Sequence, residues 1–138
     1  MATRFHKFSG KCKWPKLDKV SQYGKYEINL YLDAKSKKEY VKAGCQGQIR
    51  EDEEGSFVVL RREPHKVFNG ELKNFGKPPL VSTEGIEIDP RVLGNGSEVT
   101  CEVACFDTVK GVGTRLEKVI VSKLIEFVPA AQGQSQAA

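Results

Sequence analysis

The sequence predicts an all-β domain arranged as an antiparallel barrel or sandwich, and three observations favour this fold class. β-Branched and aromatic residues alternate with polar residues along most of the chain, which is the period of a half-buried strand. Turn residues interrupt the alternation about every ten residues, as they do between short antiparallel strands. The length of 138 residues suits a domain with its own core. We therefore expect one domain at residues 1–129 and a disordered polar tail at residues 130–138.

The first strand is expected at residues 5–14, within the stretch FHKFSGKCKWPKL. Alternation divides its side chains into an apolar set, Phe8, Cys12 and Trp14, and a basic set, Lys7, Lys11 and Lys13. Trp14 is explained equally well as a core residue and as an exposed stacking platform. The lysines fit either a solvated strand edge or a groove for a polyanion. Gly10 is expected to mark a bulge, which would reset the alternation.

A second strand and a short helix are expected next. Residues 25–32, KYEINLYL, direct Ile28, Leu30 and Leu32 to one face and Glu27, Asn29 and Tyr31 to the other. Residues 33–44, DAKSKKEYVKAG, predict a helix with Asp33 as its N-cap and Gly44 as its C-terminal stop. Its expected apolar contacts are Tyr40, Val41 and Ala43. We expect this helix to cap the barrel.

The middle of the chain is expected to hold one strand between an acidic turn and a long loop. Residues 51–55, EDEEG, predict an exposed turn, because consecutive acidic residues without partner ligands are usually solvated rather than metal-binding. The strand SFVVLRRE follows at residues 56–63. Residues 64–85 are rich in glycine, proline and asparagine, and they repeat the mixture of lysines and aromatic residues found at the start. They predict a long, partly extended loop.

The last third predicts a β-hairpin. Residues 94–107 place Val99, Cys101, Val103 and Cys105 on one face, and residues 115–129 supply the partner strand after a glycine-containing turn. The four cysteines include no CxxC pair. They therefore favour buried free thiols over a zinc site or a disulfide.

Composition and the absence of certain motifs exclude several classes of function. Residues 1–50 contain 12 Lys and Arg against 4 Asp and Glu, whereas the remaining residues contain 10 against 14. No motif of a nucleophile, a metalloprotease, a P-loop or a dinucleotide site occurs, so we expect no catalytic residue, cofactor or metal. Neither a membrane-spanning run nor a signal-peptide pattern is present. We expect a cytoplasmic protein with no membrane partner.

A basic barrel with aromatic residues beside lysines is typical of a single-stranded nucleic-acid binder, since cations follow the phosphates and rings stack on bases. One predicted wall of the groove contains Lys7, Lys11, Lys13 and Lys16, and the other contains Arg61, Arg62, Lys66 and Lys77. The stacking candidates are Tyr31, Phe57 and Phe106, followed by Trp14 and Phe75, and Arg115 is a candidate for a phosphate contact. The alternative is a β-barrel protein-interaction or structural module without nucleic-acid binding.

Residues 75–129, from FGKPPLVSTEG to the closing RLEKVIVSKL strand, resemble the C-terminal half of podovirus-type bacteriophage single-stranded DNA-binding proteins. GKCKWPKLDKVSQYGKYEINLYLD resembles their front half more loosely. The resemblance implies an OB-fold-like antiparallel β-barrel with one short capping helix and a long loop. It also implies a protein, not an enzyme, that coats single-stranded DNA with little sequence preference during phage DNA replication, recombination or repair in the infected bacterial host.

The same resemblance bears on partners. It implies single-stranded DNA as the ligand, with phage or host replication and recombination proteins and a homo-oligomer as further expectations. Many proteins of this type end in an acidic tail that contacts other replication proteins. This chain departs from that pattern, with AAQGQSQAA at residues 130–138, so the resemblance does not extend to a partner bound through the tail.

Overall fold

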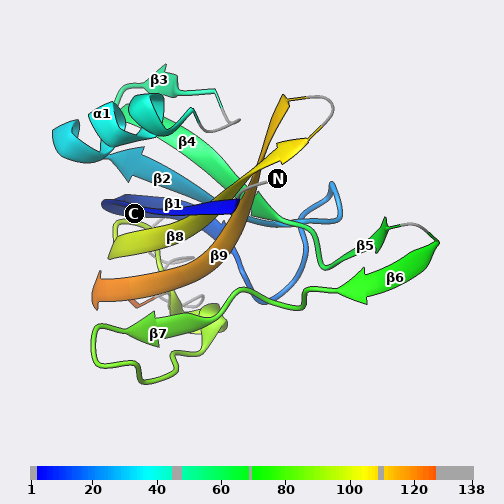
Figure 1. Cartoon of the computed structure of the whole chain (residues 1–138). Helices are drawn as coiled ribbons and strands as arrows, with labels where there is room; N and C mark the ends of the chain where they lie inside the picture. The colour runs from blue at the N-terminus through cyan, green and yellow to red at the C-terminus, as the bar shows by residue number, and fades with distance from the viewer. Residues whose placement is uncertain (1–2, 45–47, 69, 109–110, 127–138) are drawn as a thin grey trace.

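The computed structural model describes residues 3–44, 48–68, 70–108 and 111–126, most of which lie in β-strands (Figure 1). Seven strands form one mixed sheet in the order β3-β4-β2-β1-β8-β9-β7, and β5 pairs with β6 in a separate hairpin. β7 runs parallel to β9, and the other neighbours are antiparallel. The elements are β1 (Thr3–Lys16), β2 (Tyr26–Leu32), α1 (Ala34–Ala43), β3 (Arg50–Asp52), β4 (Gly55–Arg62), β5 (His65–Phe68), β6 (Glu71–Asn74), β7 (Leu80–Ser82), η1 (Pro90–Val92), β8 (Glu98–Thr108) and β9 (Gly111–Lys123).

The predicted β fold class is confirmed, although the sheet curls without a complete backbone ladder around it. β4 and β9 stand apart in the strand order, yet they contact each other. Within the described residues no backbone ladder joins them. Arg62 crosses this seam, where it is only 9% exposed, and its guanidinium donates to the carbonyl oxygens of Phe75 at 2.7 Å, Gly76 at 3.0 Å and Leu116 at 3.0 Å. One side chain thus replaces part of the missing ladder.

β1 is the strand that joins the two halves of the sheet. It pairs with β8 through residues 3–11 and with β2 through residues 10–16. At the crossover, a Cβ on Gly10 would lie 1.7 Å from the carbonyl oxygen of Tyr31, so only glycine fits. The expected bulge at Gly10 is wrong, because the register shift lies between Lys13 and Lys16 instead.

The core lies inside the curled sheet and is covered at one end by α1 (Figure 1). Its fully buried members include Phe8, Cys12, Ile28, Leu30, Val58, Leu60, Val99, Cys101, Val103, Leu116 and Val119. The helix begins and ends as predicted: the Asp33 carboxylate accepts from the backbone of Ser36 at 2.7 Å, and Gly44 has a left-handed φ of 71°. Tyr40 packs edge-on against Phe8, with 5.1 Å between the ring centroids.

Two expectations for the elements need correction. Val41 is 67% exposed and does not join the core. Residues 64–85 are not simply a long loop, because β5 and β6 form a hairpin that projects from the sheet (Figure 1). The Asn69-Gly70 dipeptide between them is a hairpin signal that the sequence already contained.

The described cysteines, Cys12, Cys101 and Cys105, are buried, and Cys12 and Cys101 are free thiols, as the sequence predicts. Burial raises the pKa of Cys12 to about 11 and raises that of Cys101 as well, so both stay protonated at neutral pH. Cys45 and the predicted tail at residues 130–138 lie outside the described residues.

Candidate nucleic-acid interface

The outer face of β1, β2 and β4 brings basic and aromatic side chains together. Strand register places Lys11 opposite Tyr31 and Tyr31 opposite Phe57, in one row across three strands. The rings of Tyr31 and Phe57 lie 5.1 Å apart at 33°, and both are half-buried. Val58 and Leu60, of opposite parity on β4, are buried. The outward orientation predicted for Tyr31 and Phe57 is therefore confirmed.

Trp14 belongs to this outer face and not to the core. Its side chain is 60% exposed, because a positive φ of 51° turns the chain away from the alternation that buries Phe8 and Cys12. The Lys13 ammonium lies 5.9 Å from the ring centroids of both Trp14 and Tyr31. One cation is thus shared by two aromatic rings, which is favourable at an exposed site. The core interpretation of Trp14 is wrong.

We call Lys11, Lys13, Trp14, Tyr31 and Phe57 the aromatic face. Its chemistry matches the two requirements for holding a single strand, because rings supply stacking surfaces and ammonium groups neutralise phosphates. Lys16 and Arg61 lie on the same three strands, although Arg61 donates to Glu27 at 2.6 Å. Lys7 is exposed farther along β1, where it lies opposite Glu102 on β8.

The acidic residues 51–55 are exposed, as predicted, and two of them also contact this face. The Tyr31 hydroxyl donates to the Asp52 carboxylate, and Lys13 forms an ion pair with Glu54. Burial, followed by the hydrogen bond to Asp52, raises the pKa of Tyr31 to about 12, so the phenol remains neutral and donates. Glu51 lies 3.7 Å from the Lys37 ammonium of α1. Two carboxylates of this turn thus contact side chains of the aromatic face.

A second aromatic and basic cluster lies at the seam between β4 and β9. The Arg115 guanidinium lies 4.7 Å from the Phe75 ring centroid and 5.6 Å from that of Phe106. It also pairs with Glu117 at 2.7 Å. Phe106 packs over Gly113, where a Cβ would lie only 2.3 Å from the ring. These contacts hold the three predicted site residues together, but as a packed cluster that is separate from the aromatic face.

The remaining predicted site residues are dispersed. Arg62 is buried in the seam, where it also lies 3.2 Å from Glu117, so the structure removes it from the accessible groove wall. Lys66 lies on the projecting β5–β6 hairpin. Lys77 follows that hairpin and pairs with Asp18 at 2.9 Å. Sequence reasoning grouped these residues because they are basic, but the fold distributes them over three regions.

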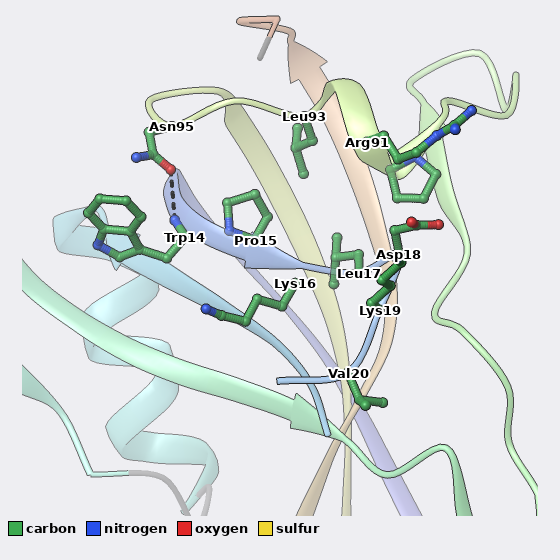
Figure 2. Close-up of a pocket in the computed structure, with 11 residues that line it drawn as sticks. Trp14, Pro15, Lys16, Leu17, Asp18, Lys19, Val20, Arg91, Leu93 and Asn95 are labelled. Carbon is green, nitrogen blue, oxygen red and sulfur yellow. Dashed lines mark hydrogen bonds between the residues drawn. The ribbon is translucent and has the colours of Figure 1, made fainter. Parts of the chain in front are cut away.

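Three residues near the aromatic face were not among the sequence candidates. Asp52 and Glu54 were assigned to a solvated turn, and Asn95 was hidden in a glycine-rich turn. The Asn95 side chain accepts a hydrogen bond from the backbone N–H of Trp14 at 2.7 Å (Figure 2). Asparagine in a turn signals a side-chain bond to nearby backbone, but its partner here is 81 residues away in the sequence.

Other kinds of site find no support in the part of the chain that the structure describes. There, no three His, Cys, Asp or Glu side chains form a group that could hold a metal ion. No helix in the same ranges is long and apolar enough to cross a membrane.

Comparisons with known proteins identify the fold. No family model and no curated protein matches the sequence. The structure is similar to gp2.5, a single-stranded DNA-binding protein of bacteriophage T7, with a TM-score of 0.66 and 14% identity over 99% of this chain and 96% of that chain. It is also similar to the single-stranded DNA-binding protein of bacteriophage Enc34, with a TM-score of 0.60 and 17% identity over 96% of this chain and 89% of that one.

The Enc34 protein in complex with single-stranded DNA gives a TM-score of 0.58 and 17% identity over 88% of each chain. At these identities the likeness concerns the fold. The chain therefore has the OB-fold-like architecture of bacteriophage single-stranded DNA-binding proteins.

Proposed function

We propose that this protein binds single-stranded DNA with little sequence preference through the aromatic face. The observation that carries the proposal is the position of the Lys13 ammonium, 5.9 Å from the rings of both Trp14 and Tyr31 on one outer surface. A strand laid across this surface would stack bases on the rings and place phosphates at Lys11 and Lys13. Every base has a π-face, so this mode of binding discriminates little between sequences.

The cellular role that we propose is to protect and organise single strands during phage DNA replication, recombination or repair, in the cytoplasm of the infected host and without catalysis. The similar folds of gp2.5 and the Enc34 protein support this proposal, since both are single-stranded DNA-binding proteins of bacteriophages. The Enc34 protein has also been seen in complex with single-stranded DNA. Phage or host replication proteins remain the protein partners that we propose.

Binding of a labelled oligothymidine of about 25 nucleotides, compared with a duplex of equal length, tests the function directly. Fluorescence anisotropy should show preferential binding to the single strand. The logarithm of the binding constant should fall against the logarithm of the salt concentration with a slope of roughly −3 to −4, because about five phosphates are neutralised. Equal, weak binding to both oligonucleotides would contradict the proposal and favour a protein-interaction module.

Replacing Glu54 by glutamine is expected to strengthen binding of single-stranded DNA by roughly two- to fivefold at low salt. The Glu54 carboxylate pairs with Lys13 on the aromatic face, so a phosphate must compete with it for this cation. Loss of an exposed ion pair changes the free energy by about 0.5–1 kcal/mol. The measurement is the same anisotropy titration.

Glu53→Gln is the matched control, because it removes the same charge from the same turn, and Glu53 makes no ion pair among the described residues. It should change the affinity less than Glu54→Gln does. Equal effects of the two variants would show that only the net charge matters and that no competition for Lys13 occurs.

A further inference from the structure

Trp14 has an unusual backbone conformation for a large side chain. Among the described residues it is the one non-glycine residue with a positive φ, at 51°. A non-glycine residue in this region is strained, and such strain persists only where the surrounding structure imposes it. Something in the fold must therefore hold Trp14 in place.

The turn at residues 94–97 holds Trp14 in this strained conformation. Its Asn95 Oδ1 accepts from the backbone N–H of Trp14 at 2.7 Å (Figure 2). The turn cannot move freely relative to β1, because the N–H of Gly96 donates to the Cys12 carbonyl at 2.8 Å and the N–H of Cys12 donates to the Ser97 carbonyl at 2.9 Å. Asn95 therefore lies in a turn that hydrogen bonds fix to β1, and its side chain accepts from the backbone of the strained residue, Trp14.

This conformation decides on which surface the indole lies. Regular alternation along β1 would direct Trp14 to the side of Phe8 and Cys12, which are fully buried. The left-handed residue instead brings the indole beside Lys13, and the shift of register between Lys13 and Lys16 follows at the same point. The strain and the Asn95 bond therefore add a third ring to the aromatic face.

The exposed indole also borders a cleft of about 380 Å³ between the end of β1 and the segment after β7 (Figure 2). Its lining includes the apolar residues Pro15, Leu17 and Leu93. Three cations also line it, namely Lys16, Lys19 and Arg91, of which Arg91 pairs with Asp89 at 2.8 Å, and the acidic lining residue is Asp18. Figure 2 shows the Lys16 ammonium extending to the same side as the indole. Apolar walls with an excess of positive charge suit a nucleotide, whose base is flat and whose phosphate is anionic.

We propose that Asn95 is a positioning residue, which holds Trp14 outward so that the indole and the adjoining cleft receive one nucleotide of the bound single strand. The inference rests on the proposed function and extends it, because it assigns a nucleotide subsite beyond the row formed by Lys11, Tyr31 and Phe57. It also gives a physical reason for the strained backbone.

Because Trp14 is the only tryptophan, intrinsic fluorescence reports its surroundings without a label. In the free protein, Asn95→Ala should lower the quenching of Trp14 by acrylamide, as the residue relaxes from its strained, exposed conformation. Asn95→Asp keeps the acceptor atom and should keep the quenching of the wild type. Ser82→Ala, which removes a side-chain acceptor for the N–H of Glu84 from a distant turn, controls for general loosening and should also leave the quenching unchanged.

A double-mutant cycle on oligothymidine affinity separates positioning from a merely structural role. Trp14→Leu and Asn95→Ala are each expected to weaken binding by about 5- to 30-fold, the loss of one stacked base. The double variant should bind no more weakly than Trp14→Leu alone, because Asn95 acts through Trp14. Unchanged acrylamide quenching in Asn95→Ala, or losses that multiply in the double variant, would overturn the inference.

The cycle also distinguishes this inference from the proposed function. Wild-type protein that binds oligothymidine, together with a cycle whose losses multiply, leaves the proposed function intact and removes only the role of Asn95. Wild-type protein that does not bind oligothymidine removes both. Oligothymidine should also quench the wild-type Trp14 fluorescence, and binding without any quenching would count against a nucleotide at the indole.

Discussion

Replacing Tyr31 and Phe57 together by leucine is expected to reduce the affinity for single-stranded DNA by more than 30-fold. The two rings form a tilted pair on the aromatic face, with 5.1 Å between their centroids and 33° between their planes. Each base that stacks on an aromatic side chain contributes about 1–3 kcal/mol, and roughly 1.4 kcal/mol corresponds to a tenfold change in the dissociation constant. Leucine keeps an apolar side chain on each strand but offers no flat surface.

Two controls make this result specific to stacking. Tyr31→Phe removes the hydrogen bond to Asp52 and retains the ring, so it should bind as well as the wild type or better. Tyr23→Leu removes an exposed tyrosine from the loop before β2, at the opposite end of that strand from Tyr31. Its affinity should stay within about twofold of the wild type, since it loses no stacked base. A double leucine variant that binds as tightly as Tyr23→Leu would place the DNA on another surface.

Replacing Arg62 by alanine is expected to lower the free energy of unfolding by about 3 kcal/mol. The guanidinium donates to the carbonyls of Phe75, Gly76 and Leu116 and lies 3.2 Å from Glu117, so its removal breaks these bonds across the seam, where Leu116 is buried. Unsatisfied buried groups cost about 1–3 kcal/mol each, although water and local relaxation recover part of the sum. Denaturant unfolding, followed by the far-ultraviolet circular dichroism of the strands, measures the change.

Arg4→Ala is the matched control for the seam. Arg4 is also an arginine paired with a carboxylate, at 3.4 Å from Asp107, but both side chains are exposed. Its removal should cost less than about 1 kcal/mol. Arg62→Lys should behave more like Arg62→Ala than like the wild type, because one ammonium group cannot reproduce a planar fork of donors. Equal stability of the Arg4 and Arg62 alanine variants would show that the seam does not depend on this side chain.

The elements whose signals are local could be predicted from the sequence. Ile28 and Leu30 alternate with outward polar residues along β2, and both are buried in the structure. The helix has its N-cap at Asp33 and its left-handed glycine at Gly44, because capping depends on residues within one turn. The outward orientation of Tyr31 and Phe57 followed from the same two-residue period, which has one unambiguous answer within a regular strand.

The tertiary structure alone decided which of the chemically similar candidates lie together. Arg61 and Arg62 are adjacent and equally basic in the sequence, yet alternation sends Arg61 to the surface and Arg62 into the seam, where distant carbonyls give it a structural role. Trp14 is the opposite case, an apolar residue that the tertiary structure exposes. The sequence left its burial and its exposure equally open, and a hydrogen bond to a turn 81 residues away holds it outside.

The sequence by itself determined the β fold, the capping helix, the basic front half and the aromatic residues that face outward. These features follow from periodicity, from capping and from composition, which are properties of neighbouring residues. The third ring of the aromatic face, the carboxylates that contact Lys13 and Tyr31, and the arginine that crosses the seam were decided by the tertiary structure. Their reason is physical: each depends on a hydrogen bond or an ion pair between segments far apart in the chain, and such contacts exist only after the sheet has curled.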